Sequence, residues 1–171
     1  MKLKLALIAL ALFMRPLNGV AAQALTDAEK KQKIEAMIAL FEPFFKVPQI
    51  DAAEAIKLAR EGSTLILDVR EDKEIKVSKI ANAITAKQFE QNPEQYKNRK
   101  IIAYCTIGYR SAAYIQKWNK RGFNMQNLRG SLLLWTHAQG TLVDSSGQAT
   151  QDVHVYGRDW DLLPAAYKAR Y

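Results

Sequence analysis

The sequence predicts an α/β fold whose central sheet consists of parallel strands covered by helices. The stretch 64–71 opens with an uninterrupted apolar run and acquires charges only at its C-terminal end, at Asp68 and Arg70. A second apolar run, 101–104, ends at Cys105 and is followed by a helix-like segment. Strands that are buried on both faces have such continuous apolar sequences. The length of 171 residues is enough for one domain with its own hydrophobic core.

Asp68 and Arg70 gain a possible function from this topology, because ligands of open α/β sheets bind at the carboxyl ends of the strands. In a supporting role, Asp68 would orient groups of a neighbouring loop, and Arg70 would pair with Asp68 or with nearby acids. The alternative interpretation is an ion pair that only organises the end of the strand.

The first residues are typical of a secretory signal peptide. Two lysines precede an apolar run at 5–14, and Ala22-Gln23-Ala24 provides a small-residue cleavage site. We therefore expect residues 1–24 to be a signal peptide and the protein to be exported, to the periplasm or the medium if bacterial. No stable membrane insertion is expected after cleavage, although Arg15 leaves an uncleaved anchor open as an alternative.

The formal net charge of +8 owes part of its size to this leader. Removal of two lysines and one arginine would leave 22 basic against 17 acidic residues, a net charge of +5. The basic residues are scattered and do not interleave with aromatics, so we expect no nucleic-acid partner. A basic face would still steer small anions toward a site. No feature of the sequence indicates an oligomeric state.

Cys105 is the single cysteine of the chain. An unpaired cysteine in an exported protein indicates an intermolecular bridge or a free reactive thiol. One cysteine excludes an internal disulfide, a Cys-x-x-Cys redox pair and a four-cysteine zinc site. With only His137 and His154 besides, we expect no catalytic metal and no cofactor.

The mature chain is expected to open with a helical extension at residues 25–49. Thr26 and Glu29 form a capping-box pattern, apolar residues recur at helical spacing from 34 to 41, and Pro43 ends the helix. We interpret the following aromatic cluster, together with the end of the helix, as core. It consists of Phe41, Phe44 and Phe45.

A second helix should start at Asp51 and end at Gly62. Between the two apolar strands we expect a connection at 74–86 and a short helix at 87–91. After Cys105 the pattern predicts a helix over 111–120 with an inward stripe, a strand over 124–128 and a short helix from 132. The residues of that stripe are Ala112, Ile115 and Trp118.

The sequence pattern changes after Gly140, and residues 140–171 are expected to be an extension that packs on the domain. A turn or hairpin is predicted at 142–147, a short strand at 153–157 and a terminal helix that ends at Tyr171. Aromatic residues of this extension should clamp it onto the domain, and they are also placed to wall one side of an active cleft. They are Tyr156, Trp160, Tyr167 and Tyr171.

The loop after the second strand has the composition of an anion site. It carries Gly108 and Arg110, and it leads into a helix N-terminus. Backbone N–H groups, the helix dipole and a guanidinium all favour negative charge on a cysteine sulfur. The Cys-x4-Arg spacing is one residue shorter than that of cysteine phosphatases, so the loop suits a smaller guest, such as one extra sulfur atom on Cys105. The candidate binding loop is Thr106, Ile107, Gly108, Tyr109, Arg110 and Ser111.

The motifs together resemble the rhodanese domain family in order and spacing over about residues 50–139. These motifs are Leu67-Asp-Val-Arg-Glu71, Cys105-Thr-Ile-Gly-Tyr-Arg-Ser111, Asn127-Leu-Arg-Gly130 and Trp135. The resemblance implies a five-stranded parallel sheet flanked by helices and a sulfurtransferase activity. Cys105 would be the nucleophile, with a small sulfur-containing anion or a persulfide as donor and a thiol or other thiophile as acceptor. The resemblance also implies that amides 106–110 bind the persulfide, that Arg110 supplies positive charge and that Ser111 caps the following helix.

Two departures from the family pattern keep other functions open. Residues 78–80 read Ser-Lys-Ile where many members have Gly-His-Ile, and the loop is bulkier and less charged than in thiosulfate-selective members. The principal alternative is a non-catalytic rhodanese-fold module that binds or regulates a partner in the periplasm. Disulfide chemistry with a partner's cysteine is a third hypothesis, which the missing resolving cysteine disfavours.

Overall fold

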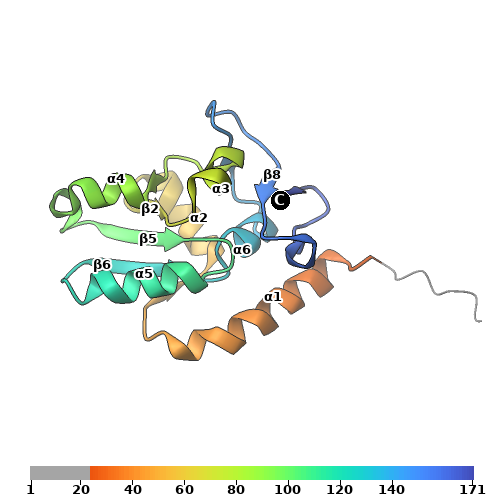
Figure 1. Cartoon of the computed structure of the whole chain (residues 1–171), viewed down its shortest axis with the longest axis horizontal. Helices are drawn as coiled ribbons and strands as arrows, with labels where there is room; N and C mark the ends of the chain where they lie inside the picture. The colour runs from red at the N-terminus through yellow and green to blue at the C-terminus, as the bar shows by residue number, and fades with distance from the viewer. Residues whose placement is uncertain (1–23) are drawn as a thin grey trace, which may run out of the picture.

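The computed structural model describes residues 24–171, so the expected signal peptide lies outside the described residues except for its last position. Five parallel strands form the central sheet in the order β1-β6-β5-β2-β4 (Figure 1), which confirms the predicted α/β fold. The strands of this sheet are β1 (Gln49–Ile50), β2 (Leu65–Asp68), β4 (Ile84–Thr85), β5 (Lys100–Tyr104) and β6 (Asn124–Leu128).

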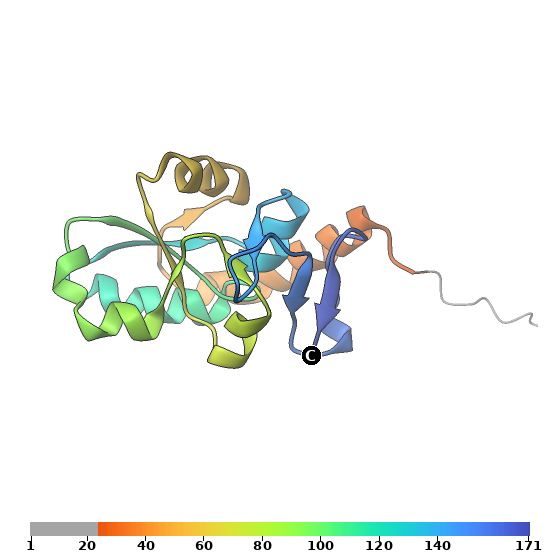
Figure 2. The same cartoon turned by 90° about the horizontal axis from the view of Figure 1, so that it is seen from above.

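Helices cover both faces of the sheet, as Figures 1 and 2 show. On one face, side chains of α4 and α5 join a core cluster with alternate residues of the strands; on the other, side chains of α1, α2 and α6 join a second cluster. The helices are α1 (Asp27–Phe41), α2 (Ala52–Glu61), α3 (Asp72–Val77), α4 (Ala86–Gln91), α5 (Tyr109–Asn119) and α6 (Ser131–His137).

Strand β5 shows why the sequence carries a continuous apolar run. Ile101 and Ala103 belong to the cluster under α4 and α5, whereas Ile102 and Tyr104 belong to the cluster under α1, α2 and α6. All four are fully buried, because successive side chains of a strand point to opposite faces. The strand therefore needs apolar residues at every position before the loop.

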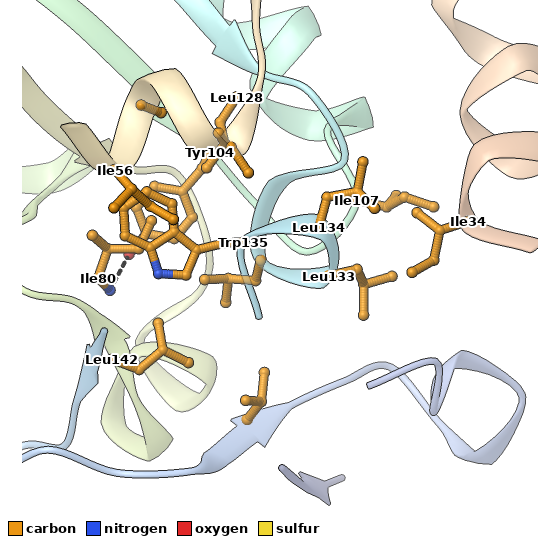
Figure 3. Packing of buried hydrophobic residues seen from close by; sticks show 14 of the residues in the cluster. Ile34, Ile56, Ile80, Tyr104, Ile107, Leu128, Leu133, Leu134, Trp135 and Leu142 are labelled. Atoms are coloured by element: carbon orange, nitrogen blue, oxygen red, sulfur yellow. Dashed lines mark hydrogen bonds between the residues drawn. The ribbon is translucent and has the colours of Figure 1, made fainter. Parts of the chain in front are cut away.

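Tyr104 lies at the end of β5 among the side chains of the larger core cluster (Figure 3). Its hydroxyl donates a hydrogen bond to Oδ2 of Asp68 at 2.5 Å and accepts one from the backbone N–H of Ile80 at 3.0 Å. Burial, followed by the charge of Asp68, raises the pKa of Tyr104 well above its ordinary value, so that the hydroxyl remains a donor. These contacts connect the ends of β2 and β5 to the chain segment at Ile80.

The N-terminal helix forms as expected. Thr26 and Glu29 make the capping box, with the Thr26 N–H donating to Glu29 Oε2 at 2.8 Å, and Ile34 and Ile38 are buried. The interpretation of the following aromatics as core was wrong for Phe44, whose side chain is 75% exposed. Phe44 lies in the 3₁₀ turn Glu42–Phe44, which ends the helix and leaves its ring outside the core.

Helix α2 also has the predicted boundaries. Asp51 accepts a hydrogen bond from the N–H of Glu54 at 2.9 Å, and Gly62 ends the helix in the left-handed conformation. Residues 112, 115 and 118 of α5 are buried, as the stripe predicted.

The expectation of a plain connection at 74–86 was wrong. Helix α3 occupies its first part, because Glu71 and Glu74 satisfy each other's backbone N–H groups across the first turn. Strand β4 then joins the sheet at its edge beside β2. In the sequence, a short strand, β3 (Lys79–Ile80), lies between α3 and β4, and it pairs with a strand outside the main sheet.

The extension beyond Gly140 differs from prediction at its end. The expected terminal helix is absent from residues 164–171, where β9 (Lys168–Arg170) pairs in parallel with β8 (Asp152–His154). Strand β7 (Leu142–Val143) pairs with β3, and a bridge between Val143 and Ala149 closes the expected hairpin. Among residues 24–171, no helix has both the length and the apolar character needed to cross a bilayer.

Replacing Tyr104 by phenylalanine removes the hydroxyl and leaves the Ile80 N–H and the Asp68 carboxylate each with one partner fewer. Because both groups are buried, we expect Tyr104→Phe to lower the free energy of unfolding by about 1–3 kcal/mol. Urea denaturation followed by circular dichroism measures this. Tyr171→Phe, at a 60% exposed position, is the matched control and should change stability by less than about 0.5 kcal/mol. Equal midpoints for both variants would contradict the structural role of the hydroxyl.

Candidate active site

The loop that carries Cys105 joins the carboxyl end of β5 to helix α5 (Figure 1). Helix α5 starts at Tyr109, two residues earlier than the sequence predicted, and Gly108 is its N-cap residue. The expected capping role of Ser111 was therefore wrong, because Ser111 lies inside the first turn of the helix. The earlier start places the positive end of an eleven-residue helix immediately after the cysteine loop.

The sulfur of Cys105 faces hydrogen-bond donors of this loop. The backbone N–H of Gly108 donates to Sγ at 3.1 Å, and the hydroxyl of Ser111 lies 3.7 Å from it. The backbone N–H of Cys105 itself donates to Oγ of Ser131 at 3.0 Å. The sulfur thus lies at the N-terminus of α5 with one backbone N–H directed at it.

The loop requires a residue without a side chain at position 108. The φ angle of Gly108 is +110°, and a Cβ atom there would lie 3.3 Å from Nδ2 of Asn127. That amide donates to the carbonyl oxygen of Gly108 at 3.2 Å, and its Oδ1 accepts a hydrogen bond from Ser111 at 2.6 Å. Asn127, which lies opposite Ala103 of β5 in the sheet, thus holds both sides of the turn that aims the Gly108 N–H at the sulfur.

Arg110 makes a bidentate ion pair with Glu74 of α3. Its Nη1 and Nη2 lie 2.7 and 2.8 Å from the carboxylate oxygens, and Nη2 also donates to Oγ1 of Thr106 at 3.3 Å. The ring of Tyr156 lies 4.9 Å from the guanidinium carbon. Burial works against the charge of Arg110, but Glu74 outweighs it and the pKa of Arg110 lies above its ordinary value.

Glu74 is the site residue that sequence reasoning missed, because the chain around it was interpreted as a connection. Its side chain is 1% exposed. Burial alone would raise its pKa, but hydrogen bonds from Arg110 and from the Glu71 N–H hold the pKa of Glu74 below its ordinary value. The capping-box spacing of Glu71 and Glu74 was the signal that could have revealed the helix, though not the pairing with Arg110.

A cavity of about 280 Å³ opens beside the cysteine. As expected, the C-terminal extension walls one side of it, through Tyr156 and Trp160. The remaining lining comes from the loop, namely Cys105, Thr106, Ile107, Tyr109 and Arg110.

The other candidate loop residues differ in what they contact. Ile107 is 5% exposed and belongs to the core cluster that contains Ile34 and Leu134 (Figure 3), so it anchors the loop. Thr106 is buried beside Glu74, with Oγ1 and Oε1 3.3 Å apart. Tyr109 is half exposed at the cavity.

Asp68 and Arg70 lie behind Tyr104 and do not line the cavity. Arg70 donates to both oxygens of Asp68, with Nη2 at 2.7 Å, and to the carbonyl oxygen of Ser78 at 2.6 Å. Burial opposes the charge of Arg70, but Asp68 outweighs it and its pKa lies above the ordinary value. The pair fixes the strand end and the turn at Ser78, which is the alternative role considered for these residues.

Neither histidine lies at the sulfur. His137 contacts the carbonyl oxygen of Leu162 through Nε2 at 2.9 Å. His154 is 9% exposed, and burial lowers its pKa. Within residues 24–171, no three His, Cys, Asp or Glu side chains are grouped so as to hold a metal ion.

A family model described as the rhodanese-like domain matches residues 51–138, just over half of the chain. The tRNA uridine(34) hydroxylase of Aster yellows witches'-broom phytoplasma (strain AYWB) is 31% identical over 104 residues, covering 53% of this chain and 34% of that protein. The protein of the same name from Acholeplasma laidlawii (strain PG-8A) is 28% identical over 108 residues, covering 58% and 33%. The chain thus matches about a third of the length of these relatives.

Solved structures share the fold. A rhodanese-related protein from Thermoplasma volcanium has a TM-score of 0.50 and 25% sequence identity, covering 56% of this chain and 97% of that one. The rhodanese-like domain of an Anabaena protein has a TM-score of 0.51 and 23% identity, covering 57% and 79%. The α/β architecture around the cysteine loop is therefore common to these proteins.

The ion pair between Glu74 and Arg110 makes stability depend on pH in a defined direction. Because the folded state lowers the pKa of Glu74, its contribution is present above the unfolded value of about 4.3 and is lost as the pH falls through the lower folded value. We expect Glu74→Gln to reduce the free energy of unfolding by about 3 kcal/mol at neutral pH. The difference from wild type should shrink as the pH falls below about 4.

Urea titrations at several pH values measure both effects. Glu94→Gln is the control, because Glu94 pairs with Lys97 at an exposed position and should change stability by less than about 1 kcal/mol. A Glu74→Gln deficit that stays constant down to acidic pH would show that the carboxylate charge does not stabilise this loop.

Proposed function

This chain belongs to the rhodanese-like domain family, and from that premise we propose that it is a sulfurtransferase in which Cys105 carries the transferred sulfur. Sulfane sulfur would pass from a thiosulfate-type or persulfide-type donor to Cys105 and then to a thiophilic acceptor. The observation that carries this proposal is the Gly108 N–H directed at the Cys105 sulfur at the N-terminus of α5.

The reaction consists of two displacements at sulfur. The Cys105 thiolate attacks the outer sulfur of the donor, a new S–S bond forms on Cys105, and the rest of the donor leaves with the electron pair of the broken bond. The acceptor then attacks the outer sulfur of the Cys105 persulfide, and the thiolate is regenerated. Neither displacement needs an external oxidant or reductant.

The loop suits a negatively charged sulfur at each stage. The Gly108 N–H and the positive end of α5 are already directed at Cys105 before the sulfur donor arrives. Hydrogen-bond donors that need no reorganisation during the reaction stabilise developing negative charge most effectively. Asn127 contributes as a positioning residue, because it holds Gly108 and Ser111 on either side of the sulfur.

The activity named for the curated relatives is not part of this proposal. They are called tRNA uridine(34) hydroxylases, and the matched stretch covers about a third of their length. The shared portion supports a domain with cysteine-based sulfur chemistry, whereas hydroxylation of tRNA belongs to the whole proteins.

One observation favours the second candidate, a non-catalytic binding or regulatory module. Cys105 is only 2% exposed, so a donor must approach it through the narrow cavity beside Tyr109 and Tyr156. A module of this kind would keep the fold and the cavity but would not accept sulfur on the cysteine. Covalent labelling therefore separates the two candidates.

Incubation with a sulfane-sulfur donor should add about 32 Da to the wild-type chain, and a reductant should remove it. Cys105→Ser should show no adduct and no sulfur release, because the chain has no other cysteine. Intact-mass spectrometry with and without reductant makes the measurement, and circular dichroism checks that the variant is folded. If folded wild type takes no sulfur from thiosulfate, thiosulfonates or small persulfides, the binding module is the better description.

Export is a separate proposal that rests on the leader sequence. We expect the protein recovered from outside the cytoplasm to begin at Leu25, after cleavage behind Ala24. The same intact-mass measurement reports the loss of residues 1–24. Recovery of the full-length chain from the membrane fraction would instead indicate that the leader anchors the protein.

A further inference from the structure

The walls of the cavity beside Cys105 are mainly aromatic. Tyr109 contributes one wall, and the edges of Phe41 and Phe45 support its ring, with centroid distances of 5.6 and 5.1 Å. Tyr156 and Trp160 contribute the wall from the C-terminal extension, with their ring centroids 5.7 Å apart. These rings offer an apolar guest both buried area and favourable ring contacts.

The positive charge of the site is already neutralised. Among the residues that line this cavity, all within the described part of the chain, Arg110 alone carries a formal charge. Its two terminal nitrogens are bound by Glu74, whose side chain is 1% exposed, and the Tyr156 ring covers the guanidinium. A doubly charged anion entering the cavity would lose hydration without gaining an unpaired cation, which is costly.

The sulfur end of the cavity differs from its walls. There the N–H of Gly108 donates to Sγ, and the N-terminus of α5 favours negative charge on the sulfur. The site therefore combines a small polar end, sized for sulfur, with a larger aromatic body. The cavity volume of about 280 Å³ is close to the lower end of the range of small-molecule sites.

We propose that the sulfur donor of this protein is a small organic sulfane-sulfur compound with an apolar body and at most one negative charge, in preference to inorganic thiosulfate. The inference rests on the proposed sulfurtransferase function and adds the substrate class to it. The apolar body lies against Tyr156, Trp160 and Tyr109, and the transferable sulfur points at Cys105.

The step balances for such a donor. With a persulfide R–S–S–H, the Cys105 thiolate attacks the terminal sulfur, Cys105–S–S–H forms and R–S⁻ leaves. With a thiosulfonate R–SO₂–S⁻, the products are Cys105–S–S⁻ and the sulfinate R–SO₂⁻. In both cases the S–S bond of the donor breaks, its electron pair leaves with the R fragment, and the proton or charge of the terminal sulfur moves with it to Cys105.

Three donors separate the contributions of charge and apolar body. Thiosulfate carries two negative charges, methanethiosulfonate carries one with a small body, and benzenethiosulfonate carries one with an aromatic body. With cyanide as the common acceptor, thiocyanate formation gives kcat/KM for each donor. Each kcat/KM is divided by the second-order rate constant for the reaction of the same donor with a free small thiolate. This division corrects for differences in the intrinsic reactivity of the donors.

For wild type, we expect the corrected kcat/KM of benzenethiosulfonate to exceed that of methanethiosulfonate by about tenfold, the effect of burying one ring. Thiosulfate should be the poorest of the three. Tyr156→Ala and Trp160→Ala should each lower the benzene-to-methane ratio toward one, because each removes a ring that the aromatic body contacts. Tyr156 is 52% exposed, so its truncation is compatible with folding even if that of Trp160 is not. Tyr171→Ala, an exposed tyrosine of the same extension, should leave the ratio unchanged.

The outcomes distinguish the two proposals. If thiosulfate equals or exceeds benzenethiosulfonate, or if the ratio in Tyr156→Ala equals that of wild type, the substrate class is wrong although Cys105 still transfers sulfur. If no donor supports thiocyanate formation by folded wild type beyond the rate of Cys105→Ser, the sulfurtransferase function itself is wrong.

Discussion

The ion pair between Arg110 and Glu74 connects the three parts of the molecule that meet at the cysteine. Arg110 follows the loop in the first turn of α5, Glu74 belongs to α3, and Tyr156 of the extension covers the guanidinium. Because the carboxylate is buried, loss of its partner would leave an uncompensated charge in the protein interior. The ion pair also neutralises the charge of Arg110. The loop amides and the N-terminus of α5 are then the groups that face a charged sulfur.

The surroundings of the cysteine loop come from two sources, the parallel sheet and the segments that flank the matched domain. The parallel sheet brings the end of β5 beside the end of β6, so that Asn127 and Ser131 reach the loop from the neighbouring strand and its helix. One wall of the cavity, formed by Tyr156 and Trp160, comes instead from outside the matched residues, and Phe41 and Phe45, which support Tyr109, also lie outside them. The surface that a donor meets is therefore set in part by the segments that flank the matched domain.

Local sequence was sufficient for those parts of the fold that depend on periodicity and capping. The buried strands, the helix from Asp51 to Gly62 and the N-terminal capping box all followed from residues close in the chain. Pairing between distant residues was not accessible in this way. The terminal segment forms β9 because β8 lies beside it, and Glu74 belongs to the site because the fold brings it to Arg110, 36 positions away. Arg110 lies at the cysteine loop, but its partner Glu74 was not visible from the sequence.

The pairing of β8 with β9 also sets an order of events during synthesis. Every strand of the central sheet has been made once residue 128 is complete, and the helix after the cysteine is complete by Asn119. The aromatic wall belongs to the segment between β8 and β9, which is closed only when residues 168–170 are present. A nascent chain thus possesses its thiol and its loop some forty residues before the wall that covers them. For that interval the cysteine lacks the wall that Tyr156 and Trp160 form in the finished protein.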